Sequence, residues 1–98
     1  MTESGSPSDD ELLKQLEEEL KTLKVSDVLV QTVFTLSSLG FQKLGEEGRD
    51  LEQAHLAIES LRALVPLLEG ALPADAIRDL NQTIANLQLG YAKCFAAG

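Results

Sequence analysis

The fold is decided by residues 51–94, which read LEQAHLAIESLRALVPLLEGALPADAIRDLNQTIANLQLGYAKC. Apolar residues recur here every three or four positions in two successive runs, and this spacing places each run on one face of an α-helix. Two such helices joined by a short connection form an antiparallel hairpin. The runs are Leu51, Ala54, Ile58, Leu61, Val65 and Leu68, and then Ile77, Leu80, Ile84, Leu87, Tyr91 and Cys94.

Proline and glycine punctuate the hairpin. We predict helices over 51–68 and 73–95. Pro66 lacks an N–H and clashes with the preceding turn, so it should kink the first helix or end it early. Gly70 is the stop signal, and Pro73 occupies the first turn of the second helix, where proline is tolerated.

The N-terminal region carries a separate helix signal. Ser8 followed by Glu11 is a capping box, which satisfies two backbone N–H groups at a helix start. The leucine spacing that follows predicts an amphipathic helix over 9–24, which we expect to be peripheral. Residues 1–7 are small and polar, and a disordered tail is expected there. The leucines concerned are Leu13, Leu16, Leu20 and Leu23.

A third helix is predicted over 27–44, with a start signal at Ser26–Asp27 and a stop at Gly45. Its apolar residues surround most of the helix, which is typical of a buried or partnered element. Its Val and Thr content also fits a strand, but the length and the lack of period-two alternation favour a helix. The prediction is an all-α fold of three to four helices in one domain over 8–98, with the hairpin packed on this apolar helix.

The chain is strongly acidic, with 16 acidic against 8 basic residues in 98 and a net charge of −8. Nucleic acids and anionic membranes bind clustered Lys and Arg, so we expect neither as a partner. The acidity fits a domain that is kept soluble by its charge, or an acidic face for a basic protein partner.

The remaining composition points to the cytoplasm. A lone Cys94 cannot form an internal disulfide, and the N-terminal sequence does not resemble a signal peptide. The longest charge-free run, residues 28–42, is shorter than a membrane span and contains several polar residues.

No catalytic, cofactor-binding or metal-binding residues are predicted. His55 is interpreted as a residue at the edge of a helix face and Cys94 as a small buried hydrophobe, because neither has an evident partner for catalysis. Glu17–Glu19 and Glu46–Glu47 are expected on solvated surfaces. Asp75 and Asp79 lie one turn apart, but nothing near them completes a calcium site. These two residues therefore do not predict a metal site.

Two glycines interrupt predicted helices, where glycine costs roughly 1 kcal/mol relative to alanine. If the helices alternate in direction, Gly40 and Gly90 lie near the same end of the bundle. We predict a close approach of the helices that carry them, backbone against backbone. Ile58 and Ile84 are predicted to be central core residues of the hairpin.

Part of the sequence resembles a small bacterial family classified as a domain of unknown function. The resemblance runs from about Val28 to Tyr91 and implies an all-helical fold and a bacterial origin, but no activity. It is carried by Leu36 through Leu44–Gly45, by Ala54-x-x-x-Ile58-Glu59-x-Leu61-x-x-Leu64, by Gly70-x-Leu72 and by Leu80-x-x-x-Ile84-x-x-Leu87-Gln88-x-x-Tyr91.

Three leucines fall outside the predicted core faces, namely Leu56, Leu67 and Leu89. They either contribute to a core that uses both faces of the hairpin, or they belong to a surface for self-association or a partner. We therefore expect a non-enzymatic interaction or accessory protein, acting as a homo-oligomer or with a protein partner. The alternative is a regulatory subunit or a small-ligand-binding helical domain, and an enzyme is third.

Overall fold

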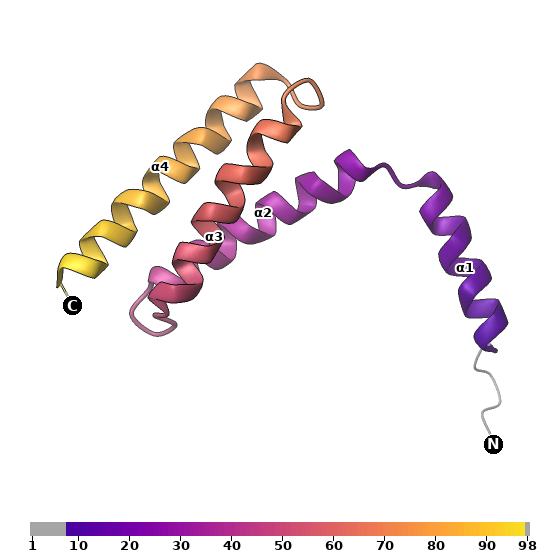
Figure 1. Ribbon diagram of the computed structural model, residues 1–98, viewed down its shortest axis with the longest axis horizontal. Coiled ribbons are helices and arrows are strands. Elements are labelled where there is room, and N and C mark those ends of the chain that lie inside the picture. Colours follow the sequence, from indigo (N-terminus) through magenta and orange to yellow (C-terminus); the bar gives the residue numbers. More distant parts are fainter. Residues whose placement is uncertain (1–7, 98) are drawn as a thin grey trace.

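The computed structural model describes residues 8–97, so the tail predicted over 1–7 lies outside the described residues. Within them the chain is all-α, and four α-helices and one short 3₁₀ helix follow one another (Figure 1). None of these helices is long and apolar enough to cross a bilayer. The elements are α1 (Asp9–Thr22), α2 (Val25–Leu44), α3 (Leu51–Leu64), η1 (Val65–Leu68) and α4 (Ala74–Ala97).

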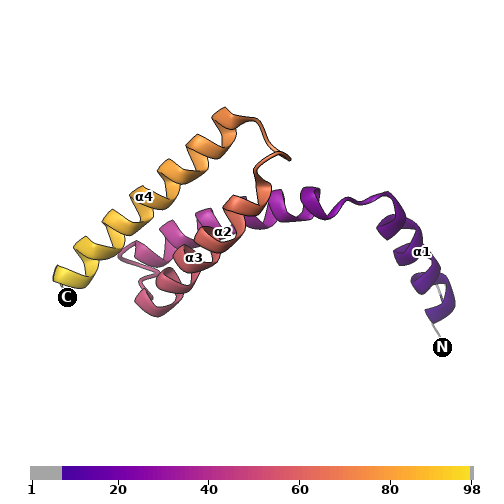
Figure 2. The same ribbon diagram turned by 45° about the horizontal axis from the view of Figure 1, so that its top comes forward.

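Helices α2, α3 and α4 alternate in direction and form a three-helix bundle, whereas α1 projects away from it (Figure 1 and Figure 2). The α3–α4 hairpin packs on α2, but the most extensive pairing is between α2 and α3. Helix α1 makes no contact with any other element. It is therefore peripheral, since only the chain connection attaches it to the bundle.

The starts of α1 and α2 have different causes. At α1 the predicted capping box forms, with the Glu11 N–H donating to Ser8 Oγ at 3.2 Å and the Ser8 N–H donating to Glu11 Oε1 at 3.1 Å. At α2 the start predicted at residues 26–27 is two residues late, and the helix begins at Val25 after Lys24, which makes no side-chain capping hydrogen bond. Asp27 lies inside that turn, where its charge favours the positive end of the helix dipole.

Pro66 changes the type of helix, as its missing N–H requires. Helix α3 ends at Leu64, and the chain continues through Pro66 as the 3₁₀ helix η1. Gly70 then adopts a left-handed conformation with φ 90°, which reverses the chain before α4. The helix predicted over 51–68 is thus an α-helix followed by one 3₁₀ turn.

The carbonyl of Leu44 joins three parts of the bundle. It lies at the end of α2, where a helix leaves carbonyl groups without partners. The Arg49 guanidinium donates to it at 3.0 Å, and the Cys94 thiol donates to it at 3.5 Å from α4. Cys94 is half-buried and therefore combines its predicted packing role with a hydrogen bond.

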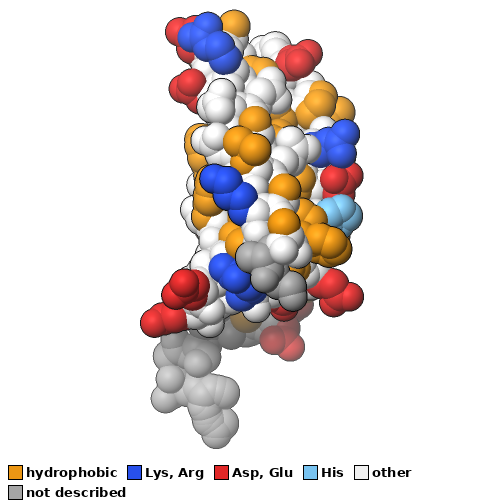
Figure 3. All heavy atoms as spheres, turned by 90° about the vertical axis from the view of Figure 1, so that its left-hand side faces the viewer, with side chains coloured by type: hydrophobic (Ala, Val, Ile, Leu, Met, Phe, Trp, Pro, Cys, Tyr) orange, Lys and Arg blue, Asp and Glu red, His pale blue; other side chains and the backbone are white. Residues whose placement is uncertain are grey.

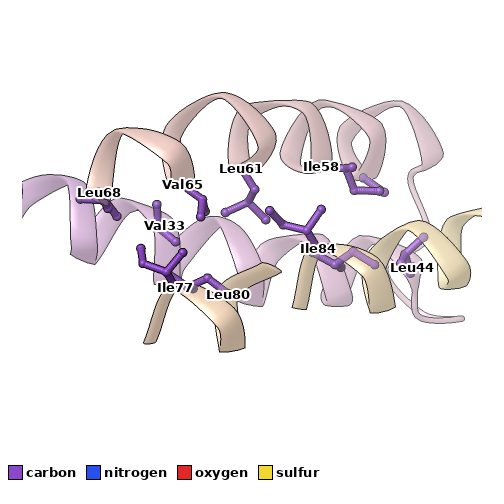
Figure 4. Close-up of a cluster of buried hydrophobic side chains, with 11 residues drawn as sticks. Val33, Leu44, Ile58, Leu61, Val65, Leu68, Ile77, Leu80 and Ile84 are labelled. Atoms are coloured by element: carbon purple, nitrogen blue, oxygen red, sulfur yellow. The ribbon is translucent and has the colours of Figure 1, made fainter. Parts of the chain in front are cut away.

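The core is purely aliphatic and contains residues from α2, α3, η1 and α4 (Figure 4). Ile58 and Ile84 belong to it, as predicted. The described part of the chain has no buried polar or charged side chain. The core residues are Val33, Leu44, Ala54, Ile58, Leu61, Val65, Leu68, Ile77, Leu80, Ile84 and Leu87.

The two helical glycines lie where α2 meets α4, but the contact is leucine against backbone. A Cβ on Gly40 would lie 3.1 Å from a methyl group of Leu87, and a Cβ on Gly90 would lie 3.0 Å from a methyl group of Leu44. Each helix therefore receives a leucine of the other at its glycine. The predicted location is correct, whereas the backbone-to-backbone contact is wrong.

Leu87 and Leu89 provide a matched test of this core. Leu87 is 0% exposed and Leu89 is 61% exposed on the same helix. We expect Leu87→Ala to lower the free energy of unfolding by about 2–5 kcal/mol, because it leaves a cavity. Leu89→Ala should change it by less than about 0.5 kcal/mol. Urea unfolding followed by circular dichroism measures both, and equal effects would contradict this packing.

The glycine contact is tested by enlarging Gly90. We expect Gly90→Leu to lower the free energy of unfolding by about 1–3 kcal/mol through overpacking against Leu44. Ala92→Leu adds similar bulk at an exposed position of α4 and serves as the control. A neutral or stabilising Gly90→Leu in thermal unfolding would show that the site has room for a large side chain.

The isolation of α1 predicts that it is dispensable for folding. Deleting residues 1–24 should leave a domain that unfolds cooperatively, with a smaller helical signal in far-ultraviolet circular dichroism. The measurement is made at about 1 µM so that association contributes little to stability. Loss of cooperative unfolding would show that α1 belongs to the core.

Candidate interaction surface

The single histidine lies on the bundle surface beside Tyr91, which in turn lies beside Phe95. The ring centroids of His55 and Tyr91 are 5.6 Å apart, and those of Tyr91 and Phe95 are 5.9 Å apart. Figure 3 shows the histidine bordering hydrophobic side chains on this face. His55 Nε2 also lies 4.0 Å from a carboxylate oxygen of Glu59 on the next turn. This arrangement matches the predicted position at the edge of a helix face.

The carboxylates singled out in the sequence are dispersed. Asp75 pairs with Arg78 at 3.0 Å, one turn along α4. Asp79 contributes its backbone carbonyl to Thr83 at 3.0 Å. Among the described residues no three His, Cys, Asp or Glu side chains lie close enough together to hold a metal ion.

Two of the hollows in the described bundle surface differ in character. The larger, about 660 Å³, is open to solvent over the loop after α2 and is lined by residues 42–43 and 45–48. The smaller, about 80 Å³, lies between α2 and α3 and has mainly leucine and alanine walls. We name it the α2–α3 groove. Its lining residues are Leu36, Leu39, Lys43, Gln53, Leu56 and Ala57.

Exposed leucines make the α2–α3 groove apolar. Leu39 on α2 is 41% exposed, and Leu56 on α3 is 56% exposed, whereas Ala57 between the two helices is buried. The groove has space for the end of one aliphatic side chain, since its volume lies between that of a water molecule and that of a benzene site. Lys43 is the charged member of this lining.

The second apolar surface belongs to α1. Its leucines are 45–65% exposed, and none of its residues is buried. The spacing aligns Leu13, Leu16 and Leu20 along one side of the helix, Leu12 lies beside them, and Leu23 follows directly after the last turn. We name this surface the leucine stripe, and it comprises Leu12, Leu13, Leu16, Leu20 and Leu23.

The surroundings of the leucine stripe are acidic. Within α1 six acidic residues outnumber two lysines, and Glu17 and Glu19 flank the stripe while Glu18 lies opposite to it. Only Leu23 and Lys24, both extended, connect α1 to α2. The stripe is thus a free apolar face on a short, tightly linked arm.

The bundle has apolar residues that its own helices do not cover. Leu56, Leu67 and Leu89 are all more than half exposed, so α2 does not cover the outer faces of the hairpin. Phe34 and Phe41 of α2 are also largely exposed. The explanation in which a three-helix core uses both faces is therefore wrong for these three leucines.

Sequence reasoning located the leucine stripe but missed the groove. The stripe is local and periodic, so its spacing reveals it. The groove combines Leu39 with Leu56 across two helices, and only the α2–α3 pairing brings them together. The outward position of Leu56 was a partial signal.

The comparisons with known proteins found no matching family model, no matching curated protein and no matching solved structure. The resemblance to a bacterial domain of unknown function receives no support from them.

Proposed function

We propose that this chain is a non-enzymatic interaction protein that associates with further copies of itself through its helices. The observation that supports this most strongly is the leucine stripe, which is exposed along α1 while α1 contacts no other element. Soluble monomers rarely leave a large continuous apolar patch uncovered, and such patches mark association sites.

The length of α1 leads to the same proposal. It has 14 residues, and an isolated helix of this length is marginal in water even with good capping. Most helical stability in proteins comes from packing of an apolar face, and α1 has no such packing within its own chain. A partner that covers the stripe would supply it.

The size of the stripe favours a reciprocal contact between two copies. Burying five half-exposed leucines gains about 4–7 kcal/mol. Association costs about 4–15 kcal/mol in lost translational and rotational freedom. One arm therefore barely offsets the cost. Two identical arms double the buried area for a single association event, which a two-fold symmetric dimer provides.

The net charge of −8 also bears on the mode of contact. Two copies repel each other at long range, although physiological salt screens exposed charges beyond about 8 Å. Association is therefore expected through the apolar surfaces and not through the acidic ones.

Light scattering after size exclusion tests self-association. We expect a mass of two chains at about 100 µM and a shift toward 10.6 kDa on dilution to about 1 µM. Replacing Leu16 and Leu20 with Gln removes the centre of the stripe and should give one chain at both concentrations. Glu18→Gln, on the opposite face of α1, is the control and should behave like the unaltered protein.

A mass of 10.6 kDa for the unaltered protein at every concentration would contradict self-association. The variant with both Leu16→Gln and Leu20→Gln could instead keep the same mass as the unaltered protein, larger than that of one chain. That result would show that the stripe is not the contact.

A further inference from the structure

We propose that the leucine stripe of one copy docks in the α2–α3 groove of a second copy, and that the second copy returns the same contact. This inference rests on the proposed self-association and specifies its surfaces. Each chain carries both an arm and a groove. In a two-fold symmetric pair each arm fills the groove of the other copy, so no arm or groove is left to add further copies.

The two surfaces are both apolar, and the groove admits the end of one leucine side chain of the stripe. The stripe presents leucine side chains at successive turns, which form a ridge along α1. The α2–α3 groove is an apolar depression between Leu39 and Leu56 with space for the end of one such side chain. A ridge entering the groove between two helices is the ordinary mode of helix packing. Docking would also cover the exposed parts of both groove leucines.

The reach of α1 excludes its own groove as the main docking site. The two-residue link forces α1, if it turns back, to run antiparallel beside α2 from Val25 onward. Its 14 residues then span about 21 Å, whereas Lys43 lies about 27 Å along α2. Turning back would align Leu13 with about Phe34, so the leucines of the stripe would stop short of Leu39 and Lys43. The arm of a second copy has no such restriction.

The charges favour docking of α1 in the groove over pairing of two α1 helices. Glu17 and Glu19 flank the stripe, so antiparallel pairing of two α1 helices would set each against its own copy. The groove lining instead carries the positive Lys43 and no acidic residue. Lys43 makes no ion pair within the described residues, whereas Arg62 and Arg78 each pair with a carboxylate on their own helix. An acidic arm therefore has an available basic partner in the groove.

Disulfide trapping between differently labelled chains tests the docking. In a Cys94→Ser background, one chain carries Glu17→Cys beside the stripe, and an isotopically heavy chain carries Gln53→Cys in the groove. Both positions are exposed, and the apolar residues stay intact. Cysteines bridge only when their Cα atoms approach within about 7 Å. We expect the mixed dimer to be the dominant oxidised product by mass spectrometry, at least about tenfold above the controls.

Matched controls use the same residue types elsewhere. Gln88→Cys replaces Gln53→Cys at an exposed position of α4, and Glu18→Cys replaces Glu17→Cys on the opposite face of α1. A chain with both Glu17→Cys and Gln53→Cys, oxidised alone, reports closure within one molecule. Dominant trapping between two Glu17→Cys chains would overturn the inference in favour of pairing between arms, and dominant closure within one chain would overturn it in favour of folding back.

Light scattering on the Cys94→Ser parent separates the two proposals. A two-chain mass with equal trapping at Gln53→Cys and Gln88→Cys would overturn the docking site and leave self-association standing. A one-chain mass at every concentration would overturn both.

Discussion

Leu87 of α4 packs over Gly40 of α2, and Leu44 of α2 packs over Gly90 of α4. This reciprocal contact lets two helices that are distant in sequence approach closely at one end of the bundle. The carbonyl of Leu44 accepts one hydrogen bond from Arg49 in the following loop and another from Cys94 of α4, and both hold the end of α2 in place. The contact joins α4 to the α2–α3 pair and closes the aliphatic core between the three helices.

A bundle closed in this way uses one face of each helix, and the consequence is an excess of apolar surface. Helix α2 buries only Val33, Gly40 and Leu44, although most of its circumference is apolar. The groove between α2 and α3 and the stripe on α1 both result from this excess. The proposed self-association would cover both surfaces.

The sequence was sufficient to predict features that depend on neighbouring residues. The capping box at Ser8, the change of helix at Pro66 and the reversal at Gly70 all occur because local backbone chemistry requires them. The apolar faces of α3 and α4 follow from spacing alone. The start of α2 was predicted two residues late because Ser26–Asp27 matched a capping signal, whereas the helix begins at Val25 after the uncapped residue Lys24.

Features that depend on what covers an apolar face could not be predicted in this way. Periodicity identified the α1 leucines and placed Leu56 outside its seam, but it does not say whether another helix lies over them. The dominance of α2–α3 pairing and the leucine-over-glycine contacts depend on side-chain shape across helices, which spacing does not contain. The α2–α3 groove exists only because of that pairing, so it had no complete signal in the sequence.

The central claim is that α1 becomes a stably packed helix only when a second copy covers its leucines. Amide hydrogen exchange measured at about 1 µM and about 100 µM tests it most directly, because exchange reports local opening at each backbone N–H. We expect fast exchange throughout α1 at the low concentration and slowed exchange in α1 at the high one, with exchange in the first turns of α3 beside the groove slowed in parallel. Exchange in α1 that is the same at both concentrations, whether fast or slow, would contradict it.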